Sequence, residues 1–401
     1  MNVLIWVNQF PTFSETFIRD QIINLKKNNL EIKIFCNYRN DSELGALCTY
    51  EKYALINDRV CLDEIIPKNK FIRILTVLSI LCNSLFSANF LIYIKSLNFF
   101  KYGKESLNLV LFFIVKFLIK NKIEIIHAHF GPNGNKASVF KELGVPIKLY
   151  TTFHGYDIRL GIEKGGGVYN SLFKNADGII AIAPYNKEKL MNFGAPKSVL
   201  IDLPNGVDVA FFNRRTPVSL EGKITILSVA RLAPEKGVLL FLKALKLFKE
   251  KHVKIDLMYS VIGEGPLREQ LERFIKTHKM GTYVKLLGSK NSEEVRHLMT
   301  NSDIFVLSSL TEVLPTVLLE AQASSMPILA THVGAVKQML TDEAQVVRPN
   351  SVEALKNGLE ELVAKRDSWR VIGEGNRKNV LNFYDIKKIT QTLLCKYKNE
   401  G

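Results

Sequence analysis

The feature that most constrains the fold is a repeated alternation of short apolar runs with longer segments of helical periodicity. The apolar runs are continuous and rich in Ile, Val and Leu, without polar positions in between. Such runs are typical of parallel strands that are buried on both faces. Repeated strand–helix units of this kind predict doubly wound α/β domains. We expect strands at 3–7, 32–36, 123–127, 149–153, 179–183 and 199–202, and again at 224–229, 257–262, 284–287, 304–307 and 328–331.

The middle of the chain separates two such series. Residues 204–222 contain two prolines, two glycines and a basic pair, with no helical or strand period. A chain of 401 residues has room for two domains of about 200 residues each. We therefore predict a first domain at 1–203, a linker at 204–222 and a second domain at 223–401, whose last helix can pack back on the first. Ligands of such sheets bind beyond the carboxyl ends of the strands, so the residues after each strand are the informative ones.

Two polar clusters follow strands of the second domain. Arg231 and Lys236 flank a turn that leads into a helix. Helix N-termini attract phosphate, so these cations either clamp a diphosphate or are solvated surface charges. Glu312 precedes a mostly apolar helix, and Glu320 lies within it, eight positions on. A carboxylate on a buried helix needs a partner, which is either a ligand hydroxyl or a structural Arg or Lys.

Three histidines lie at the ends of first-domain strands. His154 follows the strand at 149–153 and precedes a glycine turn, where it either reaches the cleft or is a satisfied structural histidine. His127 and His129 share one side of an extended strand. The three could form a metal triad, but no carboxylate at metal-ligand spacing accompanies them, and we expect no metal site.

Loops after two further strands are weaker candidates. Ser14 suits the N-cap of the helix after the first strand, and Glu15 falls in its favourable first turn. The two residues either serve only as a cap or face the cleft. Gly263 belongs to a Gly-Glu-Gly turn, but the third glycine of a dinucleotide fingerprint is missing, which argues against NAD or FAD.

Composition and missing motifs exclude several classes of protein. The chain is 47% hydrophobic and 23% charged, as in ordinary globular proteins. Its five scattered cysteines form no CxxC pair, which argues against a zinc ribbon and favours a reducing compartment. The sequence has no GxxxxGK[ST], no GxSxG and no DxD, which excludes a P-loop, a hydrolase elbow and an Asp-x-Asp metal site. The first ten residues are typical of a strand, not of a secretion signal.

The positive charge of the first half is concentrated in one apolar segment. Residues 65–122 carry nine Lys and Arg but a single acidic residue, Glu105, among long apolar runs. Basic charge beside amphipathic apolar stretches suits an anionic membrane surface. Two alternatives stay open: a transmembrane helix, which Arg73, Asn83 and Asn89 would interrupt, and ordinary helices that cover the sheet with lysine tips in water.

Taken together, these segments resemble the retaining glycosyltransferases of family 4, whose GT-B fold has two Rossmann-like domains facing across a cleft. In the second half, residues 230–237 are similar to the family's G-R-L-x-x-x-K-G segment, and Glu312 and Glu320 fit its E-x7-E motif. In the first half, FPTFSETFIRDQI, IIHAHFG and TTFHGYDIR are similar to a subgroup that builds colanic acid and other bacterial exopolysaccharides. The resemblance is weakest over 40–120, where the family's acceptor-binding parts vary.

The resemblance implies a role for each matching residue. Arg231 and Lys236 would hold the donor diphosphate. Glu312 would contact the donor sugar near its reacting carbon, Glu320 would bind the ribose, and His154 would lie beside the sugar. The other donor-side positions are Gly263, Val313, Leu314 and Thr316.

Two positions and one short segment depart from the family pattern. Val313 and Ala230 stand where the family usually has glycine, and residues 334–338 replace its G-G-x-x-E segment. Side chains at the first two positions could crowd the diphosphate. Because function depends on the site and not on the fold, we expect these departures to tune the choice of donor.

The activity implied is transfer, with retention, of a hexose or N-acetylhexosamine from a nucleotide diphosphate sugar to a lipid-linked glycan. We expect a UDP-sugar before a GDP-sugar, no cofactor or metal, and a product such as exopolysaccharide, O-antigen or capsule. The expected location is cytoplasmic, peripheral to the inner face of the bacterial membrane through 65–122, without a nucleic-acid partner. Two alternatives are another GT-B activity, either a nucleotide-sugar epimerase or a phosphorylase, and a non-enzymatic basic protein that binds membranes or nucleic acid.

Overall fold

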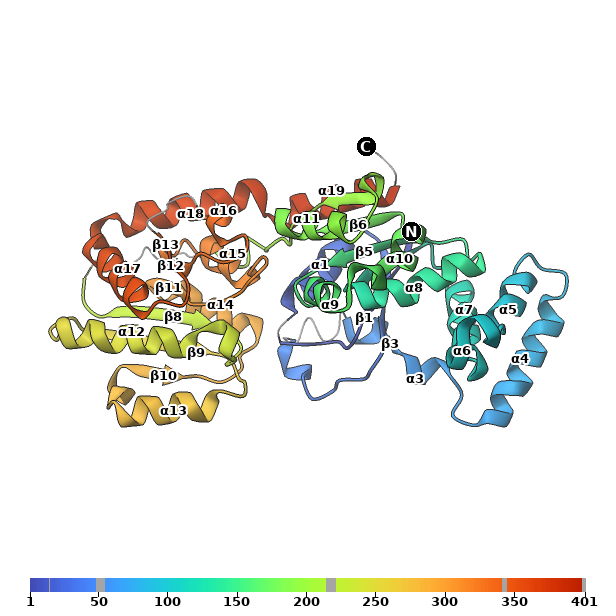
Figure 1. Ribbon diagram of the computed structural model, residues 1–401, viewed down its shortest axis with the longest axis horizontal. Helices are drawn as coiled ribbons and strands as arrows, with labels where there is room; N and C mark the ends of the chain where they lie inside the picture. The colour runs from blue at the N-terminus through green and yellow to red at the C-terminus, as the bar shows by residue number, and fades with distance from the viewer. Residues whose placement is uncertain (14, 48–54, 214–220, 341–344, 399–401) are drawn as a thin grey trace.

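The computed structural model describes the whole chain except residues 14, 48–54, 214–220, 341–344 and 399–401. It has two lobes, each built around a parallel sheet with helices on both faces (Figure 1). The strand order is β3-β2-β1-β4-β5-β6-β7 in the first lobe and β10-β9-β8-β11-β12-β13 in the second.

The strands of the two sheets are β1 (Asn2–Val7), β2 (Glu31–Cys36), β3 (Arg59–Cys61), β4 (Ile125–His129), β5 (Lys148–Phe153), β6 (Gly178–Ala181), β7 (Leu200–Asp202), β8 (Ile224–Val229), β9 (Leu257–Ile262), β10 (Val284–Leu286), β11 (Ile304–Leu307), β12 (Ile328–Thr331) and β13 (Val346–Val347). The helices of the first lobe are α1 (Thr16–Lys27), α3 (Leu62–Ile65), α4 (Lys70–Ser84), α5 (Phe90–Ser96), α6 (Phe99–Leu107), α7 (Val110–Lys120), α8 (Gly131–Leu143), α9 (Tyr156–Lys164), α10 (Asn170–Asn175) and α11 (Pro184–Asn192). The remaining helices are α12 (Val238–Lys251), α13 (Arg268–Thr277), α14 (Ser292–Thr300), α15 (Thr316–Ala323), α16 (Val336–Met339), α17 (Val352–Ala364), α18 (Trp369–Phe383) and α19 (Ile386–Lys398).

All strands expected from the sequence are present, with ends within two residues of the prediction. The sequence analysis missed β3 and β13, which are short and each pair with a single neighbouring strand. In β1, Leu4 and Trp6 join the core beside α7 and α8, whereas Val3 and Ile5 join the core beside α1 and α19. Both faces of the sheet are therefore covered, which is why its strands lack polar alternation.

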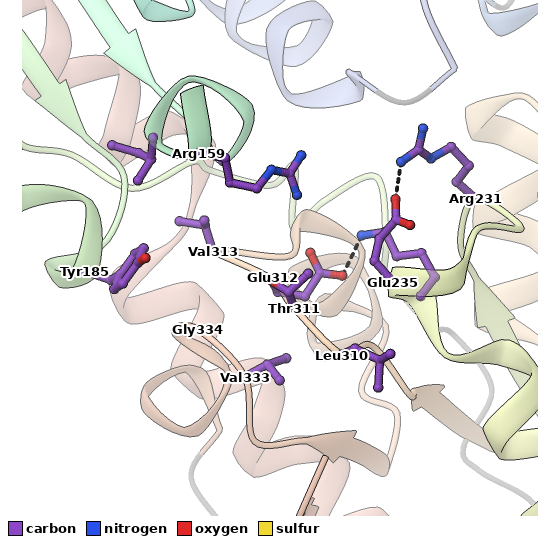
Figure 2. A pocket seen from close by; sticks show the side chains of 13 residues that line it. Arg159, Tyr185, Arg231, Glu235, Leu310, Thr311, Glu312, Val313, Val333 and Gly334 are labelled. Carbon is purple, nitrogen blue, oxygen red and sulfur yellow. Dashed lines mark hydrogen bonds and ion pairs between the residues drawn. The ribbon is translucent and has the colours of Figure 1, made fainter. Parts of the chain in front are cut away.

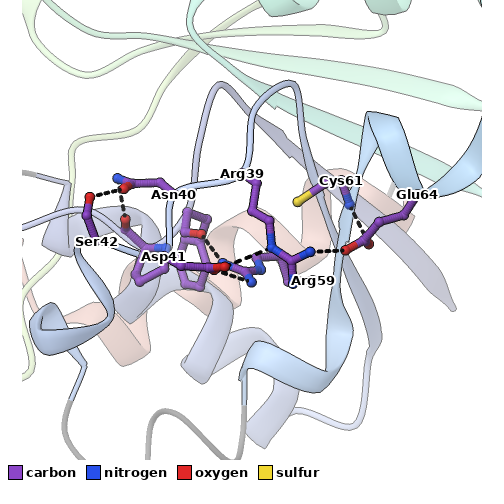
Figure 3. A network of polar contacts seen from close by, with 9 residues as sticks. Arg39, Asn40, Asp41, Ser42, Arg59, Cys61 and Glu64 are labelled. Carbon is purple, nitrogen blue, oxygen red and sulfur yellow. Dashed lines mark hydrogen bonds and ion pairs between the residues drawn. The ribbon is translucent and has the colours of Figure 1, made fainter. Parts of the chain in front are cut away.

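The edge strand β3 is tied to the loop after β2 by a network of ion pairs (Figure 3). Arg59 donates to Asp41 Oδ1 at 2.7 Å and to the carbonyl oxygen of Phe10 at 3.1 Å. Arg39 reaches Asp41 at 2.9 Å and Glu64 at 3.5 Å. These contacts hold the loops after β1 and β2 beside each other at the carboxyl end of the sheet.

The chain crosses between the lobes twice, at adjacent places. The Val207 amide donates to the Tyr384 carbonyl at 2.9 Å, and the Ile386 amide donates back to Val207 at 3.0 Å. After the second crossing, α19 packs on the first lobe, where Leu393 and Tyr397 are buried beside α1. The last helix thus covers the sheet of the lobe that begins the chain (Figure 1).

Residues 65–122 form separate helices at the outer edge of the first lobe, where α4, α5 and α6 project away from the sheet (Figure 1). No helix within the described ranges is long and apolar enough to cross a membrane. The transmembrane alternative is therefore wrong for this segment, because the chain ends α4 after 15 residues and turns. The sheet-covering alternative holds for α7, whose Leu111 and Phe112 are buried, but α4 leaves Phe71, Leu75 and Leu78 exposed.

Candidate functional site

Residues of both lobes line a cavity of about 740 Å³ at the carboxyl ends of the two sheets. Ser14 lies outside the described residues. The other predicted site residues all line this cavity: Glu15, His154, Arg231, Lys236, Gly263, Glu312, Val313, Leu314, Thr316 and Glu320. The topology thus brings together side chains that are separated by as many as 305 positions in the sequence, as expected where parallel strands end.

The turn after β8 carries the two predicted cations. Gly237 has φ +62°, and a Cβ there would lie 2.0 Å from the carbonyl oxygen of Ser308. Only glycine lets the turn pass this close to the end of β11. Lys236 then reaches Glu312 Oε1 at 2.6 Å, while Arg231 pairs with Glu235 and stays 60% exposed.

Glu312 sits in the loop between β11 and α15, held from several sides. Its Oε1 atom accepts from Ser309 Oγ at 2.7 Å as well as from Lys236, and its side chain is 11% exposed. Gly334 has φ +54°, and a Cβ there would lie 2.2 Å from the Glu312 carbonyl oxygen. Gly334, the residue of this segment that keeps a glycine of the family's G-G-x-x-E pattern, therefore lets the loop after β12 contact the loop after β11. The neighbouring Val313 side chain faces Gly155 of the first lobe, across the cleft.

Glu320 is buried in α15, with 6% of its surface exposed. Thr16 Oγ1, from the first lobe, donates to Glu320 Oε1 at 3.4 Å, which is a long hydrogen bond between the two lobes. The pKa of Glu320 is raised to about 8, chiefly by burial and secondly by the nearby Asp20 carboxylate, while Arg19 and the hydrogen bond from Thr16 act in the opposite direction. The carboxyl group is therefore largely protonated at neutral pH in the free protein.

Glu15 occupies the N-cap position of α1, because the helix begins at Thr16. The prediction that Glu15 lies in the first turn is therefore off by one residue, and its side chain makes no capping hydrogen bond. Instead it lines the cavity, where burial raises its pKa to about 7.

His154 is fixed by the turn between β5 and α9. Its amide donates to Asp157 Oδ1 at 2.9 Å, and Asn186 Nδ2 donates to its carbonyl oxygen at 2.8 Å. The imidazole packs between Phe17 and Phe130, at ring-centroid distances of 4.6 and 4.8 Å. Burial lowers the pKa of His154 to about 3, so the ring is neutral over the ordinary pH range.

His127 and His129 stack with His154 in a buried column. The ring centroids of His127 and His129 are 4.9 Å apart, and those of His129 and His154 are 5.4 Å apart. A metal site requires ligand nitrogens that point toward one common centre, and the nitrogens of these stacked rings do not. The described part of the chain contains no group of three or more His, Cys, Asp or Glu side chains that could hold a metal ion.

A second cavity of about 530 Å³ adjoins the first and reveals residues that the sequence analysis missed. Arg159 and Tyr185 line it from the first lobe, facing Glu312 and Val313 of the second (Figure 2). Arg159 stands one helical turn after Gly155 at the start of α9. Residues four positions apart lie on the same side of a helix, so this spacing from Gly155 could have pointed to Arg159 as a cleft residue.

Comparisons with known proteins identify the family. The model of glycosyl transferases group 1 matches residues 210–379, and the model of glycosyltransferase family 4 matches residues 79–211. The chain is 30% identical over 372 residues to the putative colanic acid biosynthesis glycosyltransferase WcaL of Escherichia coli K12, with 90% of each chain covered. This chain belongs to the family 4 glycosyltransferases.

Two further likenesses extend the comparison. The amylovoran biosynthesis glycosyltransferase AmsK of Erwinia amylovora is 28% identical over 353 residues, which cover 85% of this chain and 84% of AmsK. The structure of Anabaena Alr3699/HepE in complex with UDP-glucose superposes with a TM-score of 0.69 over the full length of both chains, at 13% identity. The fold of this family 4 glycosyltransferase is thus GT-B, with two Rossmann-like lobes facing across a cleft.

Proposed function

We propose that this glycosyltransferase moves a hexose or N-acetylhexosamine, with retention at the anomeric carbon, from a nucleotide diphosphate sugar to a glycan. The observation that carries the proposal is the meeting of two cations, two glutamates and a neutral histidine in one cavity between the lobes. The complex of HepE with UDP-glucose, on the same fold, favours a UDP-sugar over a GDP-sugar.

The first chemical requirement of the reaction is to stabilise the negative charge of the leaving diphosphate. Arg231 and Lys236 line the cavity, and the N-terminus of α15 opens onto it at Pro315 and Thr316. Cations and helix N-termini stabilise negative charge, so they favour departure of the diphosphate without the help of a metal ion. Lys236 is bound to Glu312 in the free protein, so a bound diphosphate competes for this cation.

The second requirement is to stabilise the sugar, because positive charge builds on it as the diphosphate leaves. The Glu312 carboxylate would hold sugar hydroxyls and favour that charge. The His154 ring, which also lines the cavity and is neutral, would lie beside the sugar without adding charge. The acceptor hydroxyl would pass its proton to the departing phosphate on the same face, and closure of the lobes would exclude water.

The acceptor proposed is a lipid-linked glycan of a bacterial surface polysaccharide. WcaL and AmsK, by their names, act in colanic acid and amylovoran biosynthesis. We define the α4–α6 apolar face by its exposed side chains, Phe71, Leu75, Leu78, Leu91 and Phe100.

This face supports contact with an anionic membrane. Lys70, Lys95 and Lys101, all exposed, stand on the same three helices as the apolar side chains. Exposed apolar side chains beside lysines match a bilayer with anionic headgroups. Docking there would place the enzyme at the cytoplasmic face of the membrane, beside a lipid-linked acceptor.

A thermal-shift panel tests the donor. UDP-, GDP-, ADP- and TDP-sugars are added with and without EDTA, since a ligand that binds the native state raises the melting temperature. We expect a shift with UDP-sugars that EDTA does not change and that Arg231→Ala abolishes. A shift that EDTA removes would overturn metal independence, and no shift with any donor would overturn the proposal. The anomeric configuration of the product, measured by NMR, tests retention.

A further inference from the structure

The smaller cavity, of about 530 Å³, is lined by a cation that the proposed function does not use. Arg159, on α9 of the first lobe, is exposed, and its guanidinium extends into the space between the lobes (Figure 2). Its side chain forms no ion pair or hydrogen bond with the described part of the chain. Glu163 stands four positions further along the same helix, where an ion pair is possible, yet none forms. Arg159 therefore stays available to a ligand.

The charges that line this cavity leave Arg159 in excess. Arg231 pairs with Glu235, and Lys236 pairs with Glu312, so each of these two cations has its own carboxylate. Three cations thus face two carboxylates among the lining residues. A concave site with an excess of one sign of charge attracts ligands of the opposite sign. The smaller cavity is therefore suited to an anion.

The position of the cavity relates this anion to the reacting sugar. Glu312, which the proposed function places beside the donor sugar, lines both cavities, whereas Glu320 lines only the larger one. A molecule in the smaller cavity thus lies next to the sugar and away from the ribose. The diphosphate already has Arg231, Lys236 and the N-terminus of α15 in the larger cavity. The anion that suits Arg159 is therefore a different group, close to the bond that is made.

Tyr185 indicates that this anion belongs to a sugar. Its ring, 42% exposed on α11, lines the same cavity as Arg159. An aromatic ring gives a flat apolar surface on which the C–H face of a sugar ring can pack, while a few polar groups fix the orientation of the ligand. The guanidinium fork matches a carboxylate through two parallel hydrogen bonds. A sugar that carries a carboxylate suits both side chains.

We propose that the smaller cavity binds a uronate, whose carboxylate accepts hydrogen bonds from Arg159 while its ring packs on Tyr185. The inference rests on the proposed function, because it takes from it the place of the donor sugar. The uronate is either a sugar of the acceptor or the sugar that is transferred, and both offer the same carboxylate. Because Arg159 and Tyr185 both belong to the first lobe, opposite the diphosphate contacts, we expect it on the acceptor.

Pairs of sugars that differ only in a carboxylate or a hydroxymethyl group on the ring test the inference. The acceptor arm compares methyl glucuronide and methyl galacturonide with methyl glucoside and methyl galactoside, by saturation-transfer NMR with and without UDP. The donor arm compares UDP-glucuronate with UDP-glucose by thermal shift. We expect a uronate to bind about tenfold more tightly than its neutral counterpart, the scale of a hydrogen bond to a charged group. The arm that shows this preference identifies the source of the carboxylate.

Four variants assign the preference to its residues. Arg159→Gln should abolish it and leave the dissociation constant for UDP and the melting temperature unchanged. Arg159→Lys keeps the charge without the fork, so part of the preference should remain. Lys164→Gln is the matched control, because Lys164 is an exposed cation of the same helix that lines neither cavity. Tyr185→Ala should weaken binding of the uronate and of its neutral counterpart alike.

Three results would overturn the inference. The first is equal binding of uronates and neutral sugars to the wild type in both arms, or no binding of either. The second is a preference that persists in Arg159→Gln. The third is loss of UDP affinity in Arg159→Gln, since the residue would then bind the diphosphate. Failure of the proposed function is a separate result, because it would appear as the absence of any thermal shift with UDP-sugars in the wild type.

Discussion

At the scale of single residues, the two cations of the cleft each form an ion pair with a glutamate, and the two pairs differ in how deeply they are buried. Lys236 is bound to a carboxylate, Glu312, that is 11% exposed, whereas Arg231 pairs with the more exposed Glu235. Under the proposed function, each variant removes one proposed contact to the diphosphate. Removal of Lys236 also leaves the nearly buried Glu312 without its cation, whereas removal of Arg231 breaks only a more exposed ion pair. We therefore expect Lys236→Ala to lose more stability than Arg231→Ala.

We expect Lys236→Ala to lower kcat/KM for a UDP-sugar by roughly 10²–10³, the usual effect of losing one preorganised charge contact. Its melting temperature should also fall, whereas that of Arg231→Ala should not. Steady-state transfer assays and thermal melts measure both quantities. Lys246→Ala is the control, because Lys246 forms an exposed i, i+4 pair with Glu250 on α12. A Lys236→Ala enzyme with the wild-type rate would refute the assignment.

The raised pKa of Glu320 predicts a dependence of stability on pH. The folded state keeps a proton on this group up to about pH 8, whereas in the unfolded chain the carboxyl group has its ordinary pKa of 4.5 and loses the proton near that pH. Between these two values the unfolded state binds fewer protons, so stability falls as the pH rises. Glu320→Gln lacks this group. Thermal melts across the window should show the variant gaining on the wild type with rising pH, and a constant difference would contradict the assignment.

At the scale of elements, the same sequence pattern has two outcomes. An amphipathic helix has one apolar face whether that face packs on a sheet or is exposed, so the sequence left membrane docking and sheet covering open for 65–122. The structure separates them, since α7 is buried and α4 is not. Strands buried on both faces have no such ambiguity, and they were predicted within two residues.

The α4–α6 apolar face yields a prediction for lipid binding. Phe71 and Leu78 are 67% and 53% exposed, so replacing both with serine should leave the melting temperature unchanged. Sedimentation with vesicles that contain about one-third anionic lipid should fall markedly for this double variant, and for the wild type at high salt. Val253→Ser is the control, because Val253 is 74% exposed beyond α12. Vesicle binding that is absent for the wild type at every salt concentration would refute docking.

At the scale of the whole molecule, the cleft depends on contacts that no single segment of sequence contains. The sequence could predict the cavity residues that directly follow a strand, because the carboxyl ends of parallel strands all lie at one edge of the sheet. Thr16 and Arg159 were not found, because their roles depend on how one lobe faces the other. The same holds for α19, which follows the second lobe in sequence but packs on the first.

The packing of α19 leads to a test of how the lobes share stability. Leu393 is 2% exposed among first-lobe core residues, so Leu393→Ala should cost about 2–5 kcal/mol of unfolding free energy. Because those contacts lie on the first lobe, hydrogen exchange should quicken in β4 and α1 but not in β8 or α12. Leu247→Ala, at 39% exposure on α12, serves as the control with little effect. If exchange quickened instead in the second lobe, α19 would stabilise the lobe that it follows in sequence. Closure of the cleft could then not be treated as motion about the paired crossings at Val207 and Ile386.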